Sequence, residues 1–378
     1  MAIYLDNSAT TRVSEKALEA MVEIMRESYG NASSVHGMGI AARGEIEKAR
    51  GMVGKCLGMD PARLVFTSGA TEANNAAILH YALEGERMGR RHIVVSAIEH
   101  PSVLECCRRL EKERGFFLSV VYPDRNGVVD VGSVAREILG DTCMVCLMAV
   151  NNETGMIQPF RDVARICEGK GIPYHCDATQ AVGHISLGDE LKEASIALSA
   201  HKFHGPKGVG CLMLPTRLTR YHALLVGGAQ ENNRRAGTEN VAGIVGMAVA
   251  LSEAHDDYRI RILRGQMLAG LENKVGGVLL NGAIDGSVPH ILNVSLTGVK
   301  GDGLVSMLSH LYGVYCSTGS ACCSGSTMPS GVLRAMGMSD GRALSAVRIS
   351  LSRYTTEWEI DRAIDAFADC VKVIRDAM

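Results

Sequence analysis

The chain of 378 residues is long enough for one large domain and a smaller one. Its 47% hydrophobic content and formal net charge of −2 exclude a disordered chain and a strongly basic nucleic-acid-binding protein. No apolar stretch approaches a membrane span, and MAIYLDNSATT lacks the basic region and apolar run of a secretory signal. The twelve cysteines are scattered, which favours reduced thiols and a cytoplasmic location.

Helices and short apolar strands alternate through the first half of the chain. An extended segment over residues 1–12 precedes an expected helix from the N-cap Ser14 to Glu27 and a second helix over Gly37–Leu57. The strands expected next are Leu64–Phe66, His92–Ser96, Phe117–Tyr122, Cys143–Val150 and a run ending at Asp177. The helices between them are expected from Thr71, from Pro101, over Val131–Leu139 and over Val163–Lys170. This alternation predicts an α/β fold, with a mostly parallel sheet between helices and sites at the carboxyl ends of its strands.

The pattern changes after Thr238. One long helical stretch is expected from Asn240 to about Val275, as a bridge between two domains. A smaller α+β unit follows, with a strand at Ile291–Leu296, a helix at Asp302–Leu311, a loop at Ser317–Pro329, a strand at Val347–Leu351 and a helix from Thr356. We therefore expect a large domain over 13–255 and a small domain that combines 1–12 with 256–378.

Two charged residues follow buried strands near the middle of the chain. Asp177 ends one apolar run, and Lys202 follows the run Ile196–Leu198 just before the glycine-rich turn Gly205–Gly210. A lysine in such a place can lose its proton and attack an aldehyde. An aspartate one strand away can keep a pyridine nitrogen protonated, which makes a bound pyridoxal ring an electron sink. By spacing alone a buried ion pair is the simpler interpretation, so the neighbouring motifs must decide.

Cys143 and Cys146 have the C-x-x-C spacing of zinc and redox sites. They lie in the apolar run TCMVCLMAV, which is typical of a central strand, and residues three apart in a strand point to opposite faces. The chain has no second C-x-x-C. We therefore expect both thiols to pack in the core.

Several motifs together resemble the cysteine desulfurases, which are pyridoxal-phosphate enzymes of the class V aminotransferase superfamily. They are DATQ at 177–180, SAHK at 199–202 and GSAC at 319–322, within a match that runs from YLDNSATT to SAVRISLSRYTTEWEI. The resemblance is to the long-loop branch that feeds iron–sulfur cluster assembly. It implies an aspartate-aminotransferase-like large domain, a small α+β domain, bound pyridoxal 5′-phosphate, and conversion of L-cysteine to L-alanine with transfer of the sulfur.

The turn FTSGATE at 66–72 runs from a strand through a glycine into a helix. Free amides and the positive end of the helix suit a phosphate there, although such a turn alone usually just connects two elements. The resemblance implies phosphate contacts from Ala70, Thr71, Ser199 and His201. It also implies that Thr238, in RRAGTEN, reaches the site of the other subunit, which makes the protein a homodimer.

The resemblance gives roles to further residues around the cofactor ring. His100 would lie over the ring and move protons, although a histidine before a proline is also common at a helix start. Asn152 would lie beside the ring and the substrate carboxylate, and Gln180 would bond the phenolic oxygen. Arg348 lies in an expected strand, where a buried arginine needs a partner. That partner is either the substrate carboxylate or a neighbouring acid.

Cys322 lies in the loop CSTGSACCSGSTMPS, whose small and polar residues have little to pack and predict an exposed thiol. The resemblance makes Cys322 the sulfur-accepting nucleophile and Lys202 the cofactor-holding lysine and base. Cys323 is a departure, because well-known relatives carry threonine or serine there, and its role is left open. No resident metal is implied, with Cys322 able to serve as an iron–sulfur ligand during cluster transfer.

The implied partners are L-cysteine and a sulfur-acceptor protein, either a cluster scaffold or a tRNA-thiolation protein, with no nucleic acid or membrane. The chain stops at Met378, where relatives that dock the scaffold carry a longer tail, so the acceptor stays open. A selenocysteine lyase or another class V enzyme would use the same Lys202 and Asp177, and the long cysteine loop argues against them. A scaffold with a vestigial site is the alternative outside enzymes, and the intact Gln180 and Arg348 argue against it.

Overall fold

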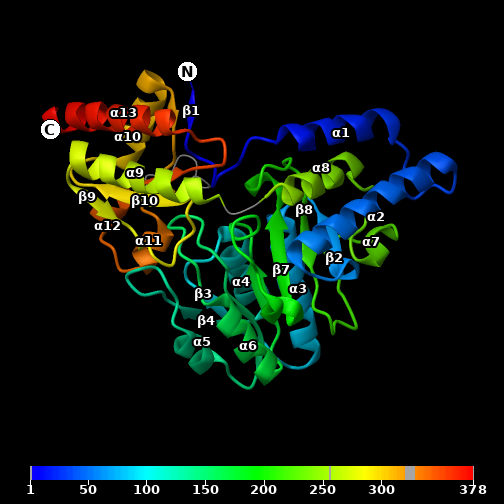
Figure 1. Cartoon of the computed structure of the whole chain (residues 1–378). Helices are drawn as coiled ribbons and strands as arrows, with labels where there is room; N and C mark the ends of the chain where they lie inside the picture. The colour runs from blue at the N-terminus through cyan, green and yellow to red at the C-terminus, as the bar shows by residue number, and fades with distance from the viewer. Residues whose placement is uncertain (1, 255–256, 320–327, 378) are drawn as a thin grey trace.

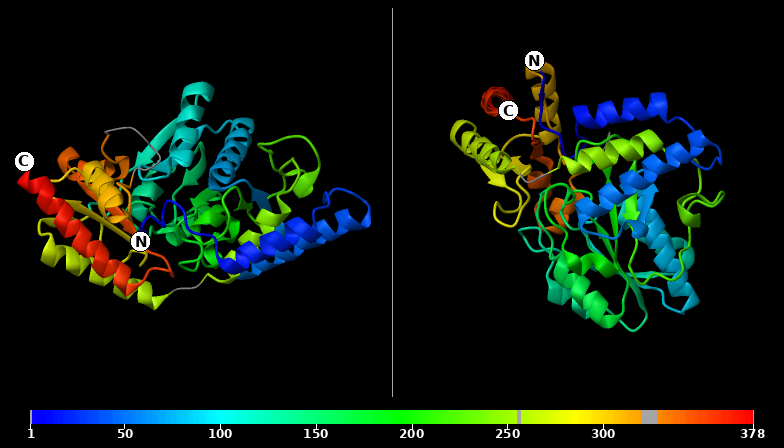
Figure 2. Two further views of the ribbon diagram at one scale, coloured as in Figure 1. Left: turned by 90° about the horizontal axis from the view of Figure 1, so that it is seen from above. Right: turned by 45° about the vertical axis from the view of Figure 1, so that its right-hand side comes forward.

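The computed structural model of the chain describes residues 2–254, 257–319 and 328–377 (Figure 1). In these ranges the helices and strands form a larger and a smaller layered unit, and the labelled chain ends both lie on the smaller one (Figure 1). The view from above shows α1 (Glu15–Glu27) and α2 (Gly37–Leu57), in blue, toward one end of the molecule and α13 (Glu357–Asp376), in red, toward the other (Figure 2, left). The first residues of the chain therefore cross from the smaller unit to the larger one.

The large sheet has seven strands within the described ranges, in the order β2-β8-β7-β6-β5-β3-β4. Their bounds are β2 Leu64–Thr67, β3 His92–Ser96, β4 Phe117–Val121, β5 Thr142–Cys146, β6 Tyr174–Asp177, β7 Ala194–Ser199 and β8 Gly210–Met213. β8 pairs antiparallel with both of its neighbours, and the other described pairings are parallel. The predicted α/β fold with a mostly parallel sheet is confirmed, and the carboxyl ends of β2, β6 and β7 meet at one edge.

Alternate residues of the strands face two different apolar layers. In β3, for example, Val94 belongs to the cluster that includes α2 and α8, whereas Ile93 and Val95 pack with α3 and α4. The covering helices are α1, α2, α3 (Ala70–Arg87), α4 (Pro101–Arg114), α5 (Val131–Glu137), α6 (Phe160–Lys170), α7 (Gln230–Asn233) and α8 (Val241–Ser252). In the described chain, no helix combines the length and apolar character that a membrane crossing requires.

The predicted positions of Cys143 and Cys146 on opposite faces of β5 are wrong. β5 has an irregular register against β3, since His92 pairs with Thr142 but Ile93 pairs with Met144, so Cys143 is an extra residue in the strand. The extra residue breaks the alternation of faces. Both thiols therefore pack in one apolar cluster with α3 and α4, and in the described chain no group of three metal-ligating side chains forms.

The small unit has its own sheet and its own core. Within the described residues, β10 (Ile291–Leu296) lies between β9 (Val278–Leu280) and β12 (Ala346–Ser350), and β1 (Ile3–Tyr4) pairs with β11 (Val314–Tyr315). The helices are α9 (Tyr258–Lys274), α10 (Gly301–Met307), α11 (Gly331–Ala335), α12 (Asp340–Leu344) and α13. Its apolar cluster combines Ile3 and Leu5 with residues from Ile260 onward. We keep the boundaries 13–255 against 1–12 with 256–378 as a proposal for the two domains.

The predicted single helical stretch from Asn240 to about Val275 is wrong. α8 ends at Ser252, and α9 begins after Asp257. Asp257 has an extended backbone, and its carboxylate accepts a hydrogen bond from the Arg259 amide at 3.0 Å, so it caps a new helix. α8 packs against α1 and α2, whereas α9 packs against α13, which explains why one straight helix would not serve both cores.

Candidate active site

A cavity of about 570 Å³ opens at the carboxyl edge of the large sheet. Its lining contains most of the site residues predicted from the sequence, namely Ala70, Thr71, His100, Asn152, Asp177, Gln180, Ser199, His201, Lys202 and Arg348. These residues come from several strand ends that are far apart in sequence. The fold therefore brings them to one place, as expected for a sheet of this kind.

Lys202 lies in a short helical turn, Ala200–Lys202, directly after β7. Its ammonium group donates hydrogen bonds to the carbonyl oxygens of Ser8 at 2.6 Å and Ala9 at 2.9 Å. The N-terminal segment is held there because the Thr11 amide donates to the His201 carbonyl at 2.9 Å. The sequence analysis gave the N-terminal segment no role at the site, although its motif YLDNSATT belongs to the resemblance described there.

Asp177 ends β6, and its carboxylate is oriented by two donors. The Asn74 amide nitrogen donates to one oxygen at 2.8 Å, and the Thr179 backbone amide donates to the other at 3.0 Å. The amide oxygen of Asn74 must then accept from His175 Nε2 at 2.9 Å, which assigns the tautomer of that histidine. Burial lowers the pKa of His175 to about 4, so this orienting chain is neutral at physiological pH. Asn74 is a functional residue that sequence reasoning missed.

The turn between β2 and α3 has the geometry of an anion cradle. Gly69 has a φ of 153°, and a Cβ on Gly210 would lie 2.8 Å from the Gly69 Cα, so β8 can approach the turn only with glycine there. The first amides of an 18-residue helix, α3, have no intrahelical acceptor and lie at this edge of the cavity. The Ser199 hydroxyl and His201 line the same side of the cavity.

His100 begins a helix and also faces the cavity, while its place over a cofactor ring stays a prediction. It is the N-cap of α4, where its Nδ1 accepts from the Ser102 amide at 3.1 Å, and it also lines the cavity. Burial lowers the pKa of His100, the charge of Asp177 raises it and that of Lys202 lowers it again. The net shift is downward, which favours a neutral imidazole.

Arg348 of β12 is almost fully buried and paired. Its Nη2 bonds Asp6 at 2.9 Å and its Nη1 donates to the Asn152 carbonyl at 2.9 Å, so the ion pair considered from the sequence is present. Its Nε has no hydrogen-bond partner among the described residues. The contact with a substrate carboxylate stays a prediction.

The cavity also holds polar groups that a ligand could complete. Gln180 donates to the Ser8 carbonyl at 2.9 Å. Within the described ranges, the buried Ser8 and Thr179 hydroxyl oxygens have no hydrogen-bond partner, and both residues line the cavity. Buried polar atoms are rarely left unsatisfied, so these groups fit a polar ligand.

Two predicted site residues are not placed in this cavity. Thr238 is exposed and does not line the cavity of its own chain. Cys322, like Cys323, lies outside the described residues. Gly319, the last described residue before that segment, does line the cavity.

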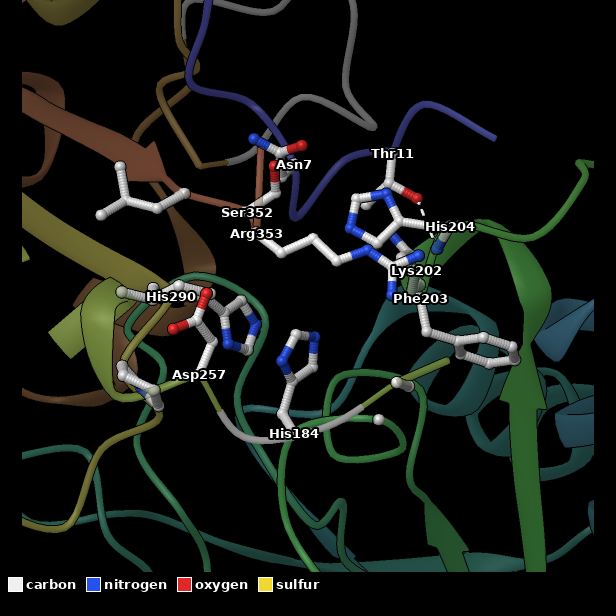
Figure 3. A pocket seen from close by; sticks show the side chains of 15 residues that line it. Asn7, Thr11, His184, Lys202, Phe203, His204, Asp257, His290, Ser352 and Arg353 are labelled. Carbon is white, nitrogen blue, oxygen red and sulfur yellow. Dashed lines mark hydrogen bonds between the residues drawn. The ribbon is translucent and has the colours of Figure 1, made fainter. Parts of the chain in front are cut away.

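Lys202 also lines a second, much smaller cavity of about 30 Å³ between the two units (Figure 3). His184 and His204 come from the large unit, and His290 comes from the small one (Figure 3). A space of this size holds about two water molecules. Lys202 therefore contacts both the main cavity and the junction of the units.

Comparison with known proteins places the whole chain among similar sequences. The family model for aminotransferase class V matches residues 3–363. Cysteine desulfurase IscS of Dictyoglomus turgidum is 39% identical, covering 99% of this chain and 95% of that protein. Cysteine desulfurase IscS of Pectobacterium carotovorum is 40% identical, covering 100% of this chain and 94% of that protein.

Solved structures also match nearly the whole chain. A NifS-like protein superposes with a TM-score of 0.91 at 39% identity, covering 99% of this chain and 100% of that one. A structure of SspA in complex with cysteine superposes with a TM-score of 0.83 at 31% identity, covering 94% of this chain and 100% of that one.

Proposed function

The chain belongs to the class V aminotransferase family, and we propose that it works as a cysteine desulfurase with pyridoxal 5′-phosphate. It takes sulfur from L-cysteine, releases L-alanine and passes the sulfur on. The observation that carries the proposal is the placement of Lys202 and Asp177. Asp177 ends β6, Lys202 follows the neighbouring strand β7, and both line one cavity. Pyridoxal 5′-phosphate needs a lysine amine that can lose its proton and bond the aldehyde, and a carboxylate that can bond the pyridine nitrogen. Lys202 and Asp177 supply these two groups in one cavity.

The cavity fits the cofactor by the chemistry of its two ends. At the turn before α3, Ala70, Thr71, Ser199 and His201 would hold the phosphate with backbone amides and polar side chains. At the other end, Asp177 would bond the pyridine nitrogen and Gln180 the phenolic oxygen, with His100 over the ring and Asn152 beside it.

The bound cofactor would supply an electron sink for negative charge at the α-carbon of the substrate. The amine of Lys202 removes the proton from that carbon, and Asp177 keeps a proton on the pyridine nitrogen. His100, kept neutral by burial, can take a proton from the substrate thiol. Arg348 binds the substrate carboxylate through the face of its guanidinium that Asp6 and Asn152 leave open.

We assign sulfur acceptance to Cys322. Its thiolate bonds the substrate sulfur while the carbon–sulfur bond breaks, which leaves a persulfide on the enzyme and, after protonation of the carbon skeleton, L-alanine. Gly319, which precedes Cys322 by three positions in the sequence, lines the cavity, and this supports the assignment.

We also propose a cytoplasmic homodimer in which Thr238 completes the partner's phosphate site, with a cluster scaffold or a tRNA-thiolation protein as sulfur acceptor. The ten cysteines in the described ranges are free thiols, which suits a reducing compartment.

Mixing inactive Lys202→Ala and Thr238→Ala subunits tests the shared site, because one site of each heterodimer then carries neither lesion. Recovery of about half the wild-type activity per heterodimer supports sharing, and no recovery contradicts it.

Covalent labelling tests the central assignment. Borohydride reduction of the reconstituted protein should fix the cofactor mass on the peptide with Lys202, and Lys202→Ala should lose both this mass and alanine release from L-cysteine. Lys207 is a matched control, since it lines the same cavity, and Lys207→Ala should keep the label at Lys202. A label on Lys207 in the wild type, or no label on any lysine, rejects the proposal.

A further inference from the structure

The loop 229–239 runs beside the phosphate turn and carries Thr238, and two arginine–carboxylate pairs help to attach it to the body of the large unit. The first attachment is Glu231. Its carboxylate pairs with Arg50 of α2 at 2.6 Å and 3.0 Å and accepts from the Phe66 amide of β2 at 2.9 Å. Figure 1 shows the short helix α7 of this loop beside α2 and β2. The attachment therefore reaches the strand that leads into the phosphate turn.

The second attachment is Arg235, which pairs with a residue next to the same turn. Its Nε and Nη2 donate to the two oxygens of Glu72 at 2.9 Å and 3.2 Å. Glu72 lies in the first turn of α3, lines the cavity and accepts from the Ser68 amide at 2.8 Å. One carboxylate therefore connects the loop to the backbone of the phosphate turn.

The loop is held in a strained conformation between these attachments. Glu231, Asn232 and Asn233 have φ angles of 47°, 57° and 62°, in the left-handed region that residues other than glycine rarely adopt. Such strain persists only where the surroundings hold it, and it gathers at functional sites. Glu231 keeps the loop in this conformation, because its side chain is buried and forms an ion pair with Arg50.

Arg235 also has an electrostatic role, because its positive charge offsets the negative charge of Glu72. A carboxylate beside an anion cradle repels a phosphate unless a cation compensates it. Burial raises the pKa of Glu72, but the hydrogen bonds from Arg235 and Ser68 outweigh burial and hold the pKa below its ordinary value. Glu72 is therefore ionised, and Arg235 neutralises it within the site.

We propose that Arg235 is a positioning residue for phosphate binding: through Glu72 it fixes the Ser68 amide and so the shape of the phosphate turn. This inference rests on the proposed function. Because Arg235 and Thr238 share one loop, the same ion pair would link the phosphate turn of one subunit to the contact that this subunit donates to its partner.

Binding of the cofactor by the apoprotein tests the proposal without measuring activity. Arg235→Gln should raise the dissociation constant for pyridoxal 5′-phosphate about tenfold, and that for pyridoxal, which lacks the phosphate, less than twofold. Glu72→Ala should do the same, because it removes the acceptor that holds both Arg235 and the Ser68 amide. The double variant should be no worse than either single one, since both remove one interaction.

Arg114→Gln is the matched control. Arg114 makes the same two-point ion pair, at 3.0 Å and 2.6 Å, with Glu86 in the last turn of α3, at the opposite end of the helix from the cavity. Its removal should leave both dissociation constants unchanged. Arg235→Lys, which keeps the charge but not the two-point geometry, should lie between Arg235→Gln and the wild type, and it serves if Arg235→Gln does not fold.

The outcomes separate the two proposals. If the wild type takes up no pyridoxal 5′-phosphate, the proposed function fails. If the wild type binds it and the Arg235 and Glu72 variants bind it equally well, only the positioning role is overturned. An equal loss of affinity for pyridoxal and its phosphate also overturns that role, because it reveals general damage to the fold.

Discussion

The imidazole rings of His184 and His290 stack with 3.6 Å between their centroids and join the two units of the molecule. His290 precedes β10 and is buried, and neither of its ring nitrogens has a hydrogen-bond partner among the described residues. Burial lowers the pKa of His290 well below its ordinary value, and the nearby His184, Arg264 and Arg348 lower it further. The junction is therefore built around a neutral histidine.

This junction predicts a loss of stability in acid. The unfolded chain takes up a proton on residue 290 near pH 6.5, and the folded chain does not, so stability falls as the pH drops below about 6.5 by up to about 1.4 kcal/mol per pH unit. Urea unfolding of the apoprotein between pH 8 and pH 5 measures the slope. His290→Gln should flatten it, whereas His310→Gln, at an exposed position of the same unit, should not. Equal slopes in all three proteins would falsify the assignment.

Glu99 predicts the opposite dependence of stability on pH, between about pH 4.3 and about pH 8. It is buried beside the active site, with one oxygen accepting from the Met148 amide at 2.7 Å and the other without a partner among the described residues. Burial and the charge of Asp177 raise the pKa of Glu99 to about 8, although the hydrogen bond from the Met148 amide lowers it. The folded state thus holds a proton that the unfolded state loses near pH 4.3, so stability falls as pH rises from there to about 8.

Glu99→Gln tests this, because glutamine mimics the protonated acid. Its stability relative to the wild type should increase with pH by up to about 1.4 kcal/mol per unit and level off above about pH 8. Urea unfolding of the two proteins from pH 5 to pH 9 gives the difference curve. A variant that loses stability evenly across this range shows that Glu99 is ionised in the fold.

Local signals predicted the elements that nearby residues determine. Ser14 accepts a hydrogen bond from the first turn of α1, as its predicted N-cap position suggested, and Thr356, where a helix was expected to begin, does the same for α13. The bulge at Cys143 was missed because it depends on pairing with another strand. The contact of Arg235 with Glu72 was missed for a similar reason, since it spans 163 positions.

The site was predicted in part. The motifs around Asp177 and Lys202 identified residues that do line one cavity. The motifs did not predict that Ser8 and Ala9 accept hydrogen bonds from Lys202. Those acceptors are backbone carbonyls, which any residue type supplies. Asn74 was missed because an asparagine inside a helix carries no motif; only the fold places it against Asp177.

Arg348 should decide the affinity for the substrate. Arg348→Lys cannot keep the contacts with Asp6 and Asn152 and also bind a carboxylate at two points, so KM for L-cysteine should rise about tenfold or more, with a smaller change in kcat. Asp6→Asn keeps an oxygen acceptor for Arg348 and should change KM only a few-fold. Steady-state kinetics on both variants checks this. If both lose thermal stability while KM stays at the wild-type value, the arginine serves the ion pair alone.

The last prediction concerns the adjacent thiols Cys322 and Cys323. One attack on the substrate sulfur breaks its bond to carbon, so we expect one of the two thiols to act as the nucleophile. The family motif gives that role to Cys322. Cys322→Ser should therefore still bind L-cysteine, seen as a change in the cofactor absorbance, yet release almost no sulfide. Cys323→Ser should keep most of the activity measured with a small reductant.

Peptide mass spectrometry after one turnover without reductant locates the sulfur. Extra sulfur on the peptide from the Cys323→Ser protein supports Cys322 as the acceptor and leaves Cys323 as a bystander. Sulfur that appears only when Cys323 is present, together with an active Cys322→Ser protein, would assign the nucleophile to the other thiol. A Cys322→Ser/Cys323→Ser double variant serves as the baseline, because any sulfur that remains on its peptide is carried by neither thiol.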